Sequence, residues 1–115
     1  MPPRDWRQRI EDITEAALRI RDYTSGMTFD SFSRDQKTVD AVIRNIILIG
    51  EAARHIPGDV QERYPNVPWT DMQAMRNLVA HQYFGVDLAI VWDTVHEDVP
   101  ALVTNMQEIL DREQR

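Results

Sequence analysis

Apolar residues recur every three or four positions through four stretches of the chain, and this spacing constrains the fold more than any other feature. Such spacing places apolar side chains along one face of a helix. No stretch alternates polar and apolar residues as a half-buried strand would. The sequence therefore predicts an all-α fold. The first helix is expected to start near Asp5, to end at Gly26, and to carry an apolar face of Trp6, Ile10, Ile13, Ala17, Ile20 and Tyr23.

The second helix has its own start and stop signals. Ser33 is followed three residues later by Gln36, which is a capping-box pattern. Pro57-Gly58 is expected to end this helix. Several prolines follow between residues 59 and 69, so one short helical turn and then a loop are expected there.

The third and fourth helices are delimited in the same way. Thr70 is expected to cap a third helix that runs to about Phe84, and Asp87 is expected to cap the last helix. Pro100 lies inside that last stretch. Because proline removes one backbone donor, we expect a kink near His96.

Length and composition limit the class of protein. The 115 residues suffice for one domain, residues 1–115, with one core. There is no cysteine, and charged residues interrupt the apolar character of the first ten positions, so we expect a cytoplasmic protein without a signal peptide. The longest apolar run, residues 46–49, is too short to cross a membrane, so no membrane partner is expected.

The net charge of −6 argues against broad electrostatic capture of nucleic acid. A local basic site remains open, because twelve of the thirteen basic residues are arginines. The planar guanidinium suits phosphate and carboxylate groups. Most of these arginines are expected to form solvated pairs on helix faces.

The third predicted helix gathers polar groups on one face. At about 100° per residue, Arg76, Asn77, His81 and Tyr83 fall on one arc. The opposite arc holds Met72, Met75, Leu78 and Val79 and should face the core. An arginine, a histidine and nearby hydroxyl and amide groups are what phosphodiester cleavage without a metal needs.

Each polar residue also has an ordinary interpretation. Arg76 could pair with a carboxylate such as Glu51, and a lone His81 is more often packed or capping than catalytic. His55 and His96 are expected at helix ends. Since the three histidines lie on different segments, no metal site and no cofactor are predicted.

The order of residues Arg76, Asn77, His81, Gln82 and Tyr83 resembles the RX4HXY motif of HEPN domains. The wider pattern is similar to the HepT-type branch of that family. It includes residues 49–53, the pair Pro68-Trp69, Val91-Trp92 and the run from Asp98 to Pro100, and it spans about the whole chain.

This resemblance implies an up-and-down bundle of four to five helices that forms a homodimer with its two motif helices facing each other. It also implies a metal-independent endoribonuclease toxin that acts on RNA. Arg76 and His81 would be catalytic, with Asn77, Tyr83 and Glu51 in supporting roles. Toxins of this branch are usually paired with a minimal nucleotidyltransferase antitoxin, which in some systems adenylylates the tyrosine that matches Tyr83.

Helical geometry adds a hypothesis about the dimer. Arg76 and His81 are five residues apart, which is about 140° around a helix axis, so they diverge on one helix. A symmetric partner could bring Arg76 of one chain near His81 of the other. Two alternatives to catalysis remain: a HEPN module that binds nucleotides or a partner protein without catalysing a reaction, and a purely structural dimerisation module.

Overall fold

The computed structural model describes residues 5–81 and 87–113, and for residues 77–81 it describes the backbone alone. These residues form helices and no strand, which confirms the all-α prediction. In chain order the helices are α1 (Trp6–Thr24), α2 (Phe29–Arg34), α3 (Gln36–Arg54), α4 (Gly58–Arg63), α5 (Trp69–His81), α6 (Leu88–Glu97) and α7 (Val99–Glu113).

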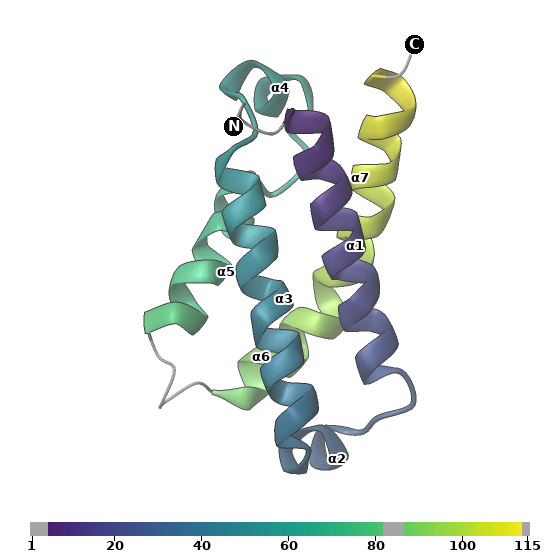
Figure 1. The fold of residues 1–115 in the computed structure, drawn as a ribbon, viewed down its shortest axis with the longest axis vertical. Coiled ribbons are helices and arrows are strands. Elements are labelled where there is room, and N and C mark those ends of the chain that lie inside the picture. Colours follow the sequence, from purple (N-terminus) through teal and green to yellow (C-terminus); the bar gives the residue numbers. More distant parts are fainter. Residues whose placement is uncertain (1–4, 82–86, 114–115) are drawn as a thin grey trace.

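The longer helices form the bundle, and two short helices cover its ends. Helix α3 packs against α1 on one side and α5 on the other, and α1 also packs against α7 (Figure 1). The six-residue helices α2 and α4 lie at opposite ends of the bundle (Figure 1). The remaining five helices match the predicted four to five. None of the helices in the described part combines the length and apolar character that crossing a membrane requires.

The core is built from the predicted apolar faces. Removing one such side chain from water stabilises the fold by about 1.5–3 kcal/mol. Tyr23, predicted at the end of the first apolar face, is instead 43% exposed. The largest fully buried side chains are Phe32, Ile10, Ile13, Ile20, Ile46, Ile49, Met72, Leu102, Met106, Ile109, Val42 and Val60.

The start of the second long helix differs from the Ser33 prediction. Ser33 lies inside α2, where its hydroxyl donates to the Asp30 carbonyl at 2.9 Å. Asp35 caps α3 instead, because its carboxylate accepts both the Thr38 amide and the Thr38 hydroxyl. These hydrogen bonds lower the pKa of Asp35. The carboxylate of Asp35, and not the hydroxyl of Ser33, therefore caps this helix.

The other predicted ends can be compared in the same way. Helix α3 ends at Arg54, three residues before Pro57, and α4 is the expected short helical turn. Helix α5 starts at Trp69, so Thr70 lies within its first turn rather than capping it, and the Pro68 carbonyl accepts the Met72 amide at 2.9 Å.

The last predicted helix is two helices. Asp87 caps α6 as predicted, accepting the Ala89 amide at 2.9 Å. Helix α6 ends at Glu97, and α7 starts at Val99, so a break replaces the expected kink. Pro100 lies in the first turn of α7, where its missing N–H would have had no helical partner.

A polar cluster joins α4 to the end of α7. The Glu113 carboxylate accepts hydrogen bonds from the Arg63 guanidinium at 2.8 Å and from the Tyr64 hydroxyl at 3.0 Å. The Arg63 hydrogen bond first, and then the Tyr64 hydrogen bond, lower the pKa of Glu113 below its ordinary value of 4.5. Burial first, and then Glu113, raise the pKa of Tyr64.

This cluster predicts a pH dependence of stability. A carboxyl whose pKa is lower in the folded state stabilises the fold above its unfolded pKa, and that contribution is lost as the pH falls through the folded pKa. Glu113→Gln should therefore lower the melting temperature at neutral pH and flatten its fall below about pH 4.5. Thermal unfolding between pH 7 and pH 3 measures this. Asp111→Asn is the control, because the hydrogen bond to Asp111 in the described part of the chain comes from neutral Gln107. Identical pH profiles for the two variants would contradict the assignment.

Candidate functional site

Two of the predicted site residues meet where α3 crosses α5. The Arg76 guanidinium Nε lies 2.9 Å from the Glu51 carboxylate Oε2 and forms an ion pair with it. The Arg76 and Glu51 side chains are 35% and 40% exposed, so the ion pair lies at the surface and can be reached by a ligand. The expected pairing of Arg76 with Glu51 therefore forms, and it places a cation and an acceptor from different helices side by side.

Gly50 explains why the two helices come so close at this point. A Cβ added to Gly50 would lie 2.6 Å from the Cβ of Arg76 and 2.9 Å from the carbonyl oxygen of Met72. Real side chains do not tolerate such distances, so only glycine permits this crossing. Met72 is fully buried on the core side of α5, and Met75 packs against the core as predicted. The glycine and the buried methionine together set the position of Arg76.

Glu51 also contacts two basic residues at the end of its own helix. Arg54 lies 3.6 Å from one carboxylate oxygen, and the His55 Nε2 lies 3.7 Å from the other. The sequence analysis had not assigned either residue to the site. Their spacing of three and four positions from Glu51 was the available signal, because such residues are neighbours on a helix. The carboxylate thus lies among three basic side chains, those of Arg54, His55 and Arg76.

The remaining predicted site residues belong to the same helix or follow it. Asn77 and His81 lie in the last turns of α5, in the region where only the backbone is described, as do Leu78 and Val79 of the predicted core face. Tyr83 lies outside the described residues. The structure therefore brings together Arg76 and Glu51.

The other two histidines occupy helix ends, as predicted. His55 is the C-terminal cap of α3. His96 lies in the last turn of α6, where its Nδ1 is 2.9 Å from the Trp92 carbonyl oxygen and its ring is 4.1 Å from the Trp92 ring. Among the described side chains, those of residues 5–76 and 87–113, no group of three or more histidines, aspartates or glutamates is arranged to hold a metal ion.

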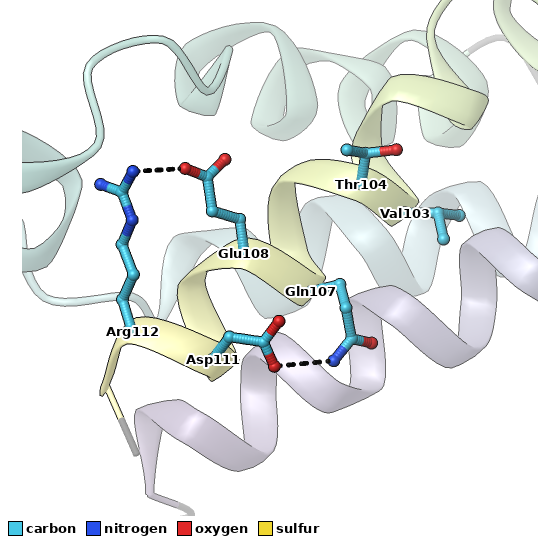
Figure 2. Close-up of a pocket in the computed structure, with 6 residues that line it drawn as sticks. All are labelled: Val103, Thr104, Gln107, Glu108, Asp111 and Arg112. Atoms are coloured by element: carbon cyan, nitrogen blue, oxygen red, sulfur yellow. Dashed lines mark hydrogen bonds and ion pairs between the residues drawn. The ribbon is translucent and has the colours of Figure 1, made fainter. Parts of the chain in front are cut away.

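A separate hollow of about 650 Å³ lies on the outer face of α7. Figure 2 shows that all six residues lining it come from this one helix. Arg112 pairs with Glu108 at 2.6 Å, and Gln107 donates to Asp111 at 3.4 Å (Figure 2). These polar groups satisfy one another, so the hollow offers no convergent set of groups for chemistry, and Arg76 with Glu51 remains the better candidate.

The family "Ribonuclease HepT-like" matches residues 13–109 of the chain. A protein of Methanocaldococcus jannaschii, named as a candidate RNase, is 43% identical over 110 residues, covering 96% of this chain and 91% of the relative. The "probable ribonuclease HepT" of Thermococcus cleftensis is 41% identical over 106 residues, covering 92% of this chain and 96% of the relative. No solved structure matches the chain. The chain therefore belongs to the HepT-like ribonuclease family of HEPN proteins.

Proposed function

We propose that this protein is a metal-independent endoribonuclease toxin. The observation that carries the proposal is the ion pair of Arg76 with Glu51, which lies at the surface of the motif helix five residues before His81. Membership of the HepT-like family and the names of its relatives support ribonuclease activity. The ion pair with Glu51 fixes the position of the cationic Arg76 side chain on α5, and the last residue of this helix is His81.

In the proposed reaction, His81 accepts the proton of the RNA 2′-hydroxyl, since a histidine titrates near neutral pH. The 2′-oxygen then forms a bond to phosphorus, and the bond from phosphorus to the 5′-oxygen breaks. The leaving 5′-oxygen takes up a proton from the imidazolium or from water. The products are a 2′,3′-cyclic phosphate and a 5′-hydroxyl, and DNA is spared because it lacks the 2′-hydroxyl.

Arg76 stabilises the charge that develops on the phosphate oxygens, because its guanidinium stays protonated. Glu51 acts as a positioning residue, because its ion pair with Nε holds the guanidinium at this side of the helix. Asn77 and the Tyr83 hydroxyl support the same site by orienting Arg76 or His81 or by binding phosphate.

The proposal includes two partners. A homodimer would bring Arg76 of one chain toward His81 of the other. A minimal nucleotidyltransferase antitoxin would neutralise the protein in the cytoplasm, with Tyr83 as the residue that it adenylylates. Adding an adenylyl group to Tyr83 would place a bulky anion two residues from His81. The intact mass of the protein, expressed with and without such an enzyme, reports the modification.

The purified full chain should cut single-stranded RNA in the presence of EDTA. The new 3′ ends should carry a 2′,3′-cyclic phosphate, and single-stranded DNA of the same sequence should remain intact. Gel electrophoresis and mass spectrometry of the fragments measure both properties. Cleavage that requires an added divalent cation would contradict the mechanism, and absence of cleavage at any protein concentration would contradict the function.

The second candidate function is binding of a nucleotide or a partner protein without catalysis. The net charge of −6 favours it, since it weakens capture of RNA. Calorimetry with mononucleotides, run beside the cleavage assay, separates the two functions: heat of binding without cleavage supports the second.

A further inference from the structure

The outward face of α3 has an open apolar centre. Leu48 is 41% exposed, and Ile47 beside it is half-buried. A hollow of about 410 Å³ lies along this face, and its lining includes Asp40, Ile43, Arg44, Ile47 and Leu48. Leu48 also lines a second hollow of about 280 Å³, which extends to Glu51 and to α1. The two hollows therefore adjoin at Leu48.

The charged and basic residues on this face lie at equal distances along the helix on either side of that centre. Each acidic residue on one side corresponds to a basic residue on the other. Arg44 lies three residues before Ile47, and Glu51 lies three residues after Leu48. Asp40 and His55 follow at seven residues on either side. Residues at these spacings share one face of a helix. Reversing the direction of α3 therefore places an acidic position opposite each basic one.

We propose that this face binds the same face of a second copy of the chain, with α3 antiparallel and the two-fold axis between Ile47 and Leu48. In this arrangement each Arg44 meets the partner's Glu51, and each Asp40 meets the partner's His55. The two apolar pairs meet at the axis. An interface around a two-fold axis is self-complementary in this way. The matched stretch from Asp40 to His55 is about 22 Å long.

The partner copy contributes a residue to the candidate site. Glu51 holds Arg76 at 2.9 Å, and the partner's Arg44 would reach the same carboxylate. A carboxylate can accept several hydrogen bonds at once. Arg44 is exposed and makes no ion pair with any other residue in the described ranges, so it can make this contact without breaking another. The α3 interface would therefore place both Arg76 side chains near the two-fold axis.

The chemistry of the face favours a second copy over RNA. A strand-binding groove combines basic side chains with aromatic rings on which bases stack. The described residues that line this face include no aromatic ring, and Asp40 and Glu51 among them would repel phosphate groups. An apolar pair flanked by charges of both signs suits a protein surface with the same pattern.

Two charge-reversal variants test the interface by their association with each other. Arg44→Glu alone places two glutamates opposite each other, and Glu51→Arg alone places two arginines opposite each other. Each variant should raise the dimer dissociation constant about tenfold or more, because both ion pairs become repulsive. An equimolar mixture should form the heterodimer, in which every contact is attractive. Native mass spectrometry distinguishes the three dimers by mass, and light scattering measures the dissociation constants.

A second pair of variants leaves Glu51 unchanged in case Glu51→Arg disturbs the fold. Asp40→Lys and His55→Glu should behave in the same way, dimerising weakly alone and preferring each other when mixed. Circular dichroism and thermal unfolding confirm that each variant is folded. The control is Arg112→Glu, a charge reversal on the outer face of α7, which should leave the dissociation constant unchanged.

The inference rests on the homodimer of the proposed function, but its test reads association rather than RNA cleavage. A dimer that all four variants leave intact, or a mixture with no preference for the heterodimer, would overturn the α3 assignment while leaving the proposed ribonuclease standing. A wild-type chain that stays monomeric would overturn it as well. Loss of cleavage with the predicted heterodimer preference intact would contradict the ribonuclease alone.

Discussion

Replacing His81 by alanine should lower the rate of RNA cleavage in EDTA by about a hundredfold to ten-thousandfold, the usual contribution of a general acid or base. Arg76→Ala should cause a loss of at least about a hundredfold, since it removes the charge that stabilises the phosphate. Arg76→Ala should stay folded, because Arg76 is partly exposed and lies outside the core. The measurement is the single-turnover rate on a labelled single-stranded RNA.

Two controls make this prediction specific. His96→Ala removes a histidine on α6 that bonds to the Trp92 carbonyl, and its cleavage rate should match the wild type. Arg76→Lys keeps the charge but loses the planar fork that binds phosphate, so it should recover only part of the activity. Full activity in either alanine variant would rule out the proposed roles of Arg76 and His81.

Gly50→Ala is expected to destabilise the protein and to impair the site. The added methyl group would lie 2.6 Å from the Arg76 Cβ and 2.9 Å from the Met72 carbonyl oxygen, so α5 must move away from α3. Overpacking of this kind costs about 1–3 kcal/mol, and the better helix propensity of alanine offsets about 1 kcal/mol of it. The net loss of unfolding free energy should be up to about 2 kcal/mol.

The same shift should reduce cleavage. A displacement of about 1 Å at a catalytic group can cost up to about a hundredfold in rate, and Arg76 lies directly at the contact. Urea unfolding and the cleavage assay measure the two effects. Gly58→Ala is the matched control, because a Cβ at Gly58 would meet no atom within 4 Å. Wild-type stability and activity in Gly50→Ala would show that the close crossing does not position Arg76.

The helix boundaries show which structural features can be predicted from the local sequence. Asp87 was predicted as a cap and is one, because a carboxylate two residues before an amide can reach it without help from the rest of the chain. The same kind of rule predicted Ser33 as a cap, and that prediction was wrong. Thr28 and Ser31 cap the short α2, and Asp35 caps α3, so two real caps compete with the predicted one. When several neighbouring residues fit the capping pattern, the local sequence alone does not show which of them caps the helix.

The site shows the same division between local and long-range information. The apolar spacing and the position of Arg76 on a polar face were readable from the sequence. Glu51 was named as a possible partner of Arg76, but the sequence did not indicate that Gly50 permits the contact. Arg54 and His55 were missed because their importance depends on where Glu51 points.

By itself, the sequence determined the helical class, most of the core positions and the window of residues 76–83 that carries the proposed chemistry. These properties depend on spacings of three and four residues, which a single helix already expresses. Only the tertiary structure decided that Arg76 lies against Glu51 and that α3 presents Leu48 to solvent. The first depends on how closely α3 and α5 approach, which is set by packing between residues more than 20 positions apart. The second depends on which faces of α3 its neighbouring helices leave uncovered.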